Sequence, residues 1–119
     1  MKLQLEKKHQ QIIQEIFDQF QNRLQGIDLL VFGSRTKGIA KSTSDLDVCL
    51  KGTEPIALTL LAELREAFIK SSLPFSVDLI DYHRITPEFQ TLIKNLYSKT
   101  LIYSGKRVAS HDSTSIFRA

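Results

Sequence analysis

The chain has little of what secreted and membrane proteins depend on. Its 119 residues contain a single cysteine, Cys49, and no tryptophan. One cysteine cannot build a disulfide framework or a cysteine-based metal cluster within one chain, which agrees with a reducing compartment. The longest apolar run, around residues 29–32, falls far short of the roughly 18 residues that a membrane span requires. No signal-peptide pattern follows the initial methionine. We therefore expect a cytoplasmic protein without a membrane segment.

Size and charge narrow the class further. A chain of this length normally makes one domain around one core, and a composition of 42% hydrophobic and 24% charged residues excludes intrinsic disorder. The net charge is +3, but residues 106–119 contribute +2 of it, with three basic side chains and one acidic one. The remaining +1 gives no basis for direct nucleic-acid binding. We expect a domain over residues 1–105 and a flexible, Ser- and Thr-rich tail over 106–119.

Apolar spacing predicts three helices and four strands. The helices are expected at 12–24, at 53–70 and from Thr86 onwards. The strands are expected at 27–32, 45–51, 75–81 and 101–103. Gly26 stands where a cap would end the first helix, and Thr53 is placed to cap the second. The order of helices and strands along the chain predicts an α/β (α+β) fold, a small mixed β-sheet with helices packed on it.

The expected buried stripes follow from the same spacing. The second helix should bury one face, consisting of Ala57, Leu60, Leu61, Leu64 and Phe68. The third should bury Phe89, Leu92, Ile93, Leu96 and Tyr97. In the strand at 45–51, Leu46, Val48 and Leu50 should face one way and Asp45, Asp47 and Cys49 the other.

Three carboxylates form a candidate site. Asp45 and Asp47 are two apart on one strand and so project from the same face, and Asp78 lies in a strand otherwise built of core residues. If those strands are neighbours, the three acids converge and could hold two Mg²⁺ ions for a displacement at phosphorus. A simpler alternative is that the strand acids, Asp81 and Asp28 included, lie on a solvated face. Asp78 would then sit on a half-exposed strand or pair with Arg84 or Lys94.

The segment before these acids favours a phosphate ligand. Gly33 and Ser34 directly follow an apolar strand, and ten residues separate them from Asp45. Such a turn lets backbone amides and a hydroxyl approach phosphate oxygens, and Arg35, Lys37 and Lys41 add positive charge. An isolated Gly-Ser would be an ordinary turn, but its spacing to the paired acids makes the combination specific.

Three stretches resemble the minimal nucleotidyltransferases of the DNA polymerase beta superfamily. They are Leu-Val-Phe-Gly-Ser-Arg-Thr-Lys-Gly at 30–38, Ser-Asp-Leu-Asp-Val at 44–48 and Val-Asp-Leu-Ile at 77–80. The resemblance covers roughly residues 17–103. It implies the DNA polymerase beta-like nucleotidyltransferase fold and the transfer of a nucleoside monophosphate, AMP from ATP, to a hydroxyl, with release of pyrophosphate.

The resemblance also implies roles for individual residues. Gly33 and Ser34 would hold the nucleotide triphosphate, with Arg35 and Lys37 at basic positions of the same nucleotide site. The metal ligands for two Mg²⁺ ions would be Asp45, Asp47 and Asp78. Asp78 would also help to activate the acceptor hydroxyl.

A chain this short leaves little room for an acceptor platform, since only about forty residues follow Asp78. The resemblance implies a partner, a helical HEPN-domain toxin whose tyrosine is adenylylated, with this chain as the antitoxin of the pair. The alternative is a nucleotide-binding module that neutralises or scaffolds a helical partner by contact without catalysis. Transfer to a small molecule also stays open.

Overall fold

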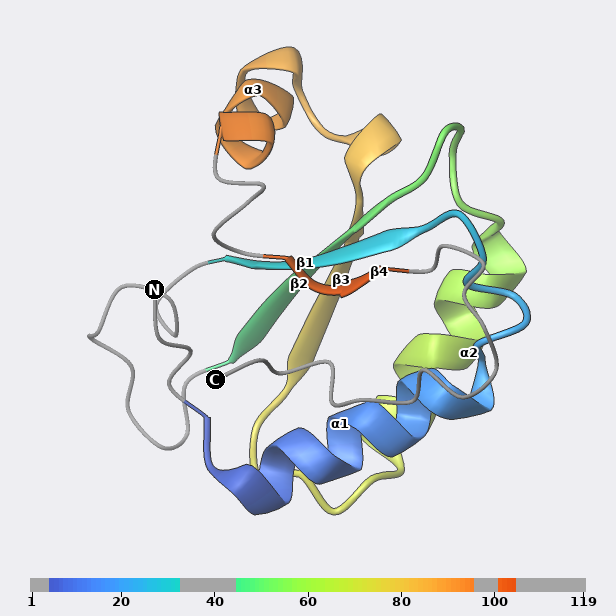
Figure 1. The fold of residues 1–119 in the computed structure, drawn as a ribbon, viewed down its shortest axis with the longest axis vertical. Coiled ribbons are helices and arrows are strands. Elements are labelled where there is room, and N and C mark those ends of the chain that lie inside the picture. The colour runs from blue at the N-terminus through green and yellow to red at the C-terminus, as the bar shows by residue number, and fades with distance from the viewer. Residues whose placement is uncertain (1–4, 33–44, 96–100, 105–119) are drawn as a thin grey trace.

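The structure, a computed structural model, describes residues 5–32, 45–95 and 101–104. These ranges form helices α1 (Lys7–Gln19), α2 (Leu58–Ile69) and α3 (Pro87–Asn95), the short 3-10 helix η2 (Tyr82–Arg84), and strands β1 (Asp28–Phe32), β2 (Leu46–Lys51), β3 (Val77–Asp81) and β4 (Leu101–Ser104) (Figure 1). All four predicted strands are present. The expected boundary between the domain and its tail lies outside the described residues.

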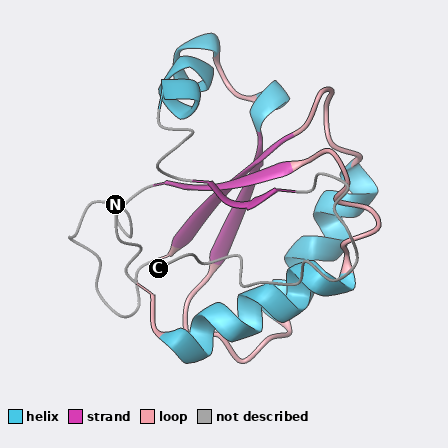
Figure 2. Ribbon diagram, in the orientation of Figure 1, coloured by secondary structure: helices cyan, strands magenta, loops and turns pink. Residues whose placement is uncertain are grey.

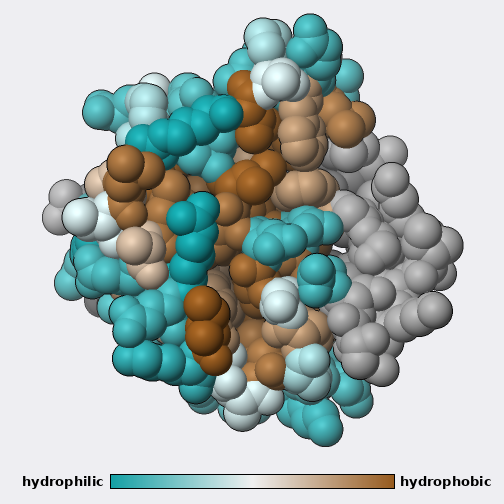
Figure 3. Space-filling model, turned by 180° about the vertical axis from the view of Figure 1, so that it is seen from behind, coloured by the Kyte–Doolittle hydropathy of each residue, from teal (hydrophilic) through white to brown (hydrophobic). Residues whose placement is uncertain are grey.

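The strands form one mixed sheet in the order β3-β2-β1-β4. β1 is antiparallel to both β2 and β4, whereas β2 and β3 are parallel. Parallel neighbours need a crossover connection, and α2 provides it (Figure 2). β3 lies behind β2 in Figure 1, at an edge of the sheet, so the reverse view in Figure 3 faces the outer side of β3. The predicted small mixed sheet with packed helices is confirmed.

The main core lies between the sheet and the pair α1 and α2 (Figure 2). Leu46, Val48 and Leu50 of β2 all point into it, as the alternation predicted. Phe17 of α1 meets Phe68 of α2 edge to face, with ring centroids 5.6 Å apart. The other face of the sheet, which carries the odd-numbered residues of β2, therefore does not contact α1 and α2. None of the described helices has the length and apolar character that a membrane crossing demands.

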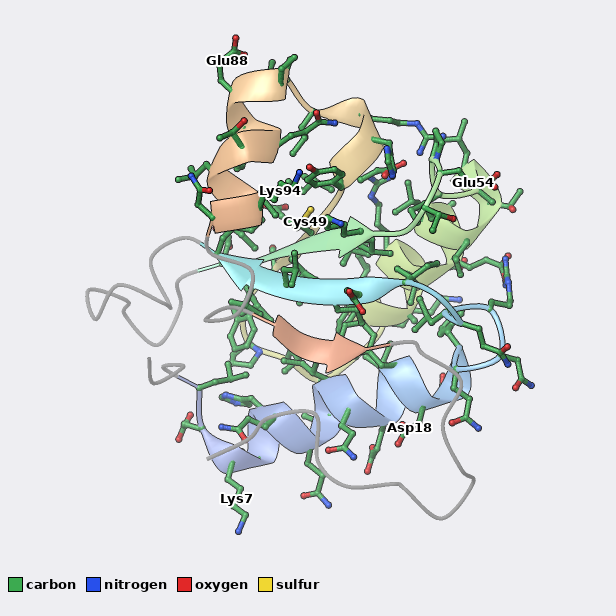
Figure 4. All side chains as sticks on the ribbon, turned by 45° about the horizontal axis from the view of Figure 1, so that its top comes forward. Lys7, Asp18, Cys49, Glu54, Glu88 and Lys94 are labelled. Atoms are coloured by element: carbon green, nitrogen blue, oxygen red, sulfur yellow. The ribbon has the colours of Figure 1, made fainter. Side chains whose placement is uncertain are left out.

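A smaller cluster occupies that opposite face. Leu30, Cys49 and Ile93 are buried in it, with Ile80 and Phe89 among the residues packed around them. The labelled Cys49 in Figure 4 lies between the sheet and the α3 side of the molecule. α3 and the preceding η2 thus cover only part of this face, and Asp47, near the start of β2, lies at the border of the cluster beside Phe32.

Two predicted helix boundaries are wrong. α1 ends at Gln19 and turns follow it, so Gly26, whose φ is +77°, makes a turn before β1 instead of capping the helix. Thr53 does not cap α2, which begins at Leu58 with Ala57 as its N-cap. The reason is tertiary: the backbone N–H of buried Ile56 donates to a carboxylate of β3, which holds this stretch outside the helix.

Two predicted core positions are also wrong. Ala57 is exposed, because it precedes the first turn of α2. Leu92 is 53% exposed, because the nine-residue α3 turns Phe89 and buried Ile93 toward the sheet and leaves Leu92 on the other side. Leu60, Leu61, Leu64 and Phe68 are buried as predicted. Leu96 and Tyr97 lie outside the described residues.

Candidate functional site

The parallel pairing of β2 and β3 sets Asp47 directly beside Asp78. On its other side, Asp47 is registered with Phe32 of β1, so Phe32, Asp47 and Asp78 form one row across three strands. The preceding row, Leu30, Cys49 and Ile80, is the apolar one that α3 covers. The predicted convergence of Asp47 and Asp78 is therefore confirmed. Asp78 is exposed and Asp47 is half-buried, so neither carboxylate is enclosed in the core.

Electrostatics ties all three predicted acids together. Burial raises the pKa of the Asp47 carboxyl above its ordinary value, and so do the negative charges of Asp78 and Asp45 and a hydrogen bond with Asp78. Asp45 lies just before β2 and is exposed. A proton on Asp47 or a cation beside it would relieve this repulsion. The site is thus built to attract positive charge.

The acids suit Mg²⁺ as a two-carboxylate set. Within the described ranges, no group of three or more His, Cys, Asp or Glu side chains is arranged to hold a metal ion. Mg²⁺ does not need such a cage, because one or two carboxylates plus substrate phosphates and waters usually complete its octahedron. Asp47 and Asp78, adjacent in register and mutually repulsive, fit that requirement.

A hollow of about 860 Å³ opens beside these carboxylates. Asp47 and Asp78 contribute to its lining, and most of the other lining residues are apolar. They include Phe32, Phe68, Ile69, Leu73, Pro74, Phe75, Val77, Leu79, Ile80 and Phe89. Ligand pockets are commonly about 300–1,000 Å³ and mainly apolar with a few polar groups. The acids therefore border a ligand-sized space that continues past them along β3.

An aromatic wall of this hollow was not predicted. Phe32 and Phe89 meet edge to face, with ring centroids 5.4 Å apart, and both line the hollow. Strand alternation could have placed Phe32 on the face of Asp47, since it lies two residues after Leu30 in β1. The contact with Phe89 depends on where α3 packs, which no local pattern encodes.

A fourth carboxylate, Asp81, has a structural role that sequence analysis missed. It is only 4% exposed, and it accepts hydrogen bonds from the backbone N–H groups of Ile56 (2.8 Å) and His83 (3.0 Å). Its remaining partner is Arg84. The suggested pairing of Arg84 with Asp78 is therefore wrong, and so is the view of Asp81 as a solvated residue. The bond to His83, two residues later, is an Asx-turn pattern that the sequence could have signalled.

The predicted phosphate-binding residues cannot be placed. Gly33, Ser34, Arg35 and Lys37 lie outside the described residues, so their role stays a prediction. Phe32, the last described residue before them, is registered with Asp47.

Cys49 is a buried residue of the smaller apolar cluster. Burial, with a smaller effect from Asp81, raises the pKa of its thiol to about 12, so the thiol stays protonated and unreactive at neutral pH.

Comparison with known proteins points to one family. The model of the family described as "Polymerase beta, Nucleotidyltransferase" matches residues 10–108. The chain is 42% identical over 66 residues to a Haemophilus influenzae protein named "Probable protein adenylyltransferase MntA", which is 56% of this chain and 58% of that protein. It is 31% identical over 97 residues to a Methanocaldococcus jannaschii protein named "Putative protein adenylyltransferase MJ1217", covering 82% of this chain and 88% of that one.

A solved structure shares the fold. It is a crystal structure of a toxin-antitoxin with AMP-PNP, and one of its chains matches with a TM-score of 0.56 at 17% identity. The match covers 87% of this chain and 77% of that chain. At this level of identity the likeness concerns the arrangement of helices and strands.

Proposed function

The chain belongs to the polymerase beta nucleotidyltransferase family, and from that premise we propose that it is a magnesium-dependent protein adenylyltransferase that moves AMP from ATP to a protein hydroxyl. The observation that carries the proposal is the register of β2 and β3, which sets Asp47 beside Asp78 at the border of a ligand-sized hollow. The names of the two relatives support a protein as the acceptor.

The reaction is an in-line displacement at the α-phosphorus of ATP. The acceptor oxygen forms a bond to that phosphorus, the bond from phosphorus to the oxygen that bridges to the β-phosphate breaks, and pyrophosphate leaves. Mg²⁺, when bound, would neutralise the phosphate oxygens and align them for this displacement. The carboxylates that would hold it are Asp45, Asp47 and Asp78.

The exposure of the acids suggests how their tasks divide. Asp47 is half-buried between Phe32 and Asp78, so it is held in place and suited to anchoring a cation. Asp78 is exposed on the edge strand, where an incoming hydroxyl can reach it and pass its proton to the carboxylate and on to solvent. Gly33, Ser34, Arg35 and Lys37 are proposed to hold the triphosphate.

We further propose that the acceptor is a tyrosine of a HEPN-domain toxin and that this chain is its antitoxin. The toxin-antitoxin neighbour with AMP-PNP is consistent with a protein partner and a nucleotide at a site of this fold. In this proposal the covalently attached AMP silences the toxin. Binding of the antitoxin to the toxin without transfer of AMP would leave the toxin active.

The test is transfer to a candidate partner. The purified chain is incubated with a HEPN protein encoded beside it, ATP and Mg²⁺, and the intact mass of the partner is measured. We expect a gain of one adenylate that is lost with Asp47→Asn and with EDTA. The matched control is Asp18→Asn, the same chemical change on α1, which contributes to the opposite side of the sheet from Asp47.

Two results would contradict the proposal. One is an unchanged partner mass with wild-type chain and a partner of verified toxicity. The other is full neutralisation of the toxin by Asp47→Asn, because that outcome identifies a module that acts by contact.

A further inference from the structure

The outer side of β3 is an unpaired sheet edge. The C=O of Ser76 accepts from the N–H of Leu46, so the backbone of Ser76 faces β2, and by alternation the backbone groups of Val77 and Leu79 face outward. Across residues 5–32, 45–95 and 101–104, the only hydrogen bond found on this outer side joins the guanidinium of Arg65 to the C=O of Leu79 (3.1 Å). The edge therefore offers free main-chain groups, of the kind to which a further strand can add.

An apolar wall runs along this edge. The hollow beside Asp47 and Asp78 extends along β3 to Phe68 and Ile69 of α2. Ile69 is 82% exposed, although it is a large apolar residue. Brown, apolar surface crosses the middle of this face in Figure 3. One continuous hollow thus joins the carboxylates, the free edge and an exposed apolar rim.

We propose that the acceptor protein docks here as an extended segment that adds a strand to the outer edge of β3. Its backbone pairs with the N–H and C=O of Val77 and with the N–H of Leu79, because the C=O of Leu79 already accepts from Arg65. Its apolar side chains contact Ile69. This inference rests on the proposed function, because it names how the protein substrate of that reaction is held. Strand addition of this kind draws affinity from main-chain bonds and specificity from pockets for alternate side chains.

The register explains why this edge suits the reaction. Phe32, Asp47 and Asp78 form a row across the sheet, and a docked residue opposite Asp78 extends that row by one position. Neighbouring strands lie about 4.8 Å apart and their aligned side chains share a face. A hydroxyl-bearing residue at that position therefore places its oxygen next to the Asp78 carboxylate, on the same face as Asp47.

A polypeptide fits this edge better than a nucleic acid does. Free N–H and C=O groups along an edge match the repeat of another extended backbone, and the rim contributed by Ile69 is apolar. The carboxylates of Asp47 and Asp78 would repel a phosphate backbone that lacked bound cations. Arg65 exposes a charge at this edge, as native edge strands commonly do to resist unspecific pairing.

The first variant that tests this docking mode is Val77→Pro. Val77 begins β3 and its N–H faces outward, a position where proline leaves the bonds to β2 intact. With the partner that the wild-type chain adenylylates, we expect the KM for the partner to rise about tenfold. The kcat, the KM for ATP and the thermal shift produced by Mg²⁺ and ATP should stay at wild-type values.

A second pair of variants makes the test independent of any strain from proline. Ile69→Lys places a charge on the rim, whereas Leu58→Lys makes the same change at the other end of α2, at a 67% exposed residue that does not line the hollow. We expect a raised KM for the partner with Ile69→Lys and a wild-type value with Leu58→Lys.

Three outcomes separate the possibilities. Wild-type KM values for the partner with both Val77→Pro and Ile69→Lys would overturn the docking mode while leaving the transferase activity in place. A melting temperature of isolated Ile69→Lys far below that of Leu58→Lys would overturn it too, since a segment of this chain or a second copy would then cover the rim. Absence of transfer by the wild-type chain would instead contradict the proposed function.

Discussion

Removing the charge of Asp47 should stabilise the metal-free protein while abolishing its response to Mg²⁺. The change Asp47→Asn keeps the shape of the side chain and lets its amide donate to Asp78, but ends the repulsion among Asp47, Asp78 and Asp45. Active-site groups that must bind a cation are commonly strained in its absence, so function and stability oppose each other here.

The size of the effect follows from the register. Asp47 and Asp78 are paired on adjacent strands, which lie about 4.8 Å apart. Two unit charges about 5 Å apart near water repel by roughly 1 kcal/mol, and the exposure of Asp78 keeps the effective dielectric high. For a domain of this size, about 1 kcal/mol corresponds to a rise in melting temperature of about 4 °C.

The direction of the pKa shift of Asp47 also determines the pH range in which Asp47→Asn is more stable than wild type. Because the folded state raises the pKa of Asp47 above its ordinary value of 3.8, the folded state binds a proton more tightly than the unfolded state does. Stability therefore falls as pH rises from about 3.8 through the folded-state pKa, and the penalty is fully present at pH 7. The advantage of Asp47→Asn should be full at neutral pH and vanish below pH 3.8.

The assay is thermal unfolding at pH 7.5 in EDTA and again with Mg²⁺ and a non-hydrolysable ATP analogue. The melting temperature of the wild-type chain should rise when Mg²⁺ and the analogue are added, and that of Asp47→Asn should not. Asp18→Asn is the matched control: burial and Glu15 raise the pKa of Asp18 too, so its variant should also be stabilised but should keep the full Mg²⁺ response.

The reasoning would be refuted by an Asp47→Asn chain that is less stable than wild type at neutral pH without metal. It would also be refuted if Asp47→Asn and Asp18→Asn responded equally to Mg²⁺ and nucleotide.

The structure makes further predictions about stability and reactivity. Asp81→Ala should cost about 3 kcal/mol in urea denaturation, since it leaves the N–H of buried Ile56 without its acceptor. Arg84→Ala should cost about 1 kcal/mol, because the Asp81 carboxylate keeps the N–H donors of Ile56 and His83 and the lost Arg84 side chain is 40% exposed. Equal losses of unfolding free energy in Asp81→Ala and Arg84→Ala would contradict the conclusion that the Asp81 carboxylate is the main stabilising group here. Cys49, whose thiol pKa is raised to about 12, should resist alkylation by iodoacetamide at pH 8 and react after unfolding in urea, as mass spectrometry can show. Rapid labelling of the folded chain would show that this face is open.

The face assignments could be predicted because alternation is a local property. Two-residue periodicity in residues 45–51 was enough to separate Leu46, Val48 and Leu50 from Asp47 and Cys49, and the structure confirms the split between its two apolar clusters. Helix ends were harder, because Thr53 has the chemistry of a cap and the hydrogen bond from Ile56 to Asp81 overrides it. That bond joins residues 25 positions apart, beyond the reach of any local pattern.

The sequence by itself determined which residues are acids, which strand faces they occupy and which family they resemble, since each of these depends on composition or short-range spacing. Only the tertiary structure decided that β3 lies parallel to β2 with Asp78 against Asp47, that Asp81 is buried, and that β3 is an edge. Asp47 and Asp78 are 31 residues apart, and their register is set by how α2 packs its apolar face on the sheet. Contacts over such separations come from the burial of the whole core, which no single segment encodes.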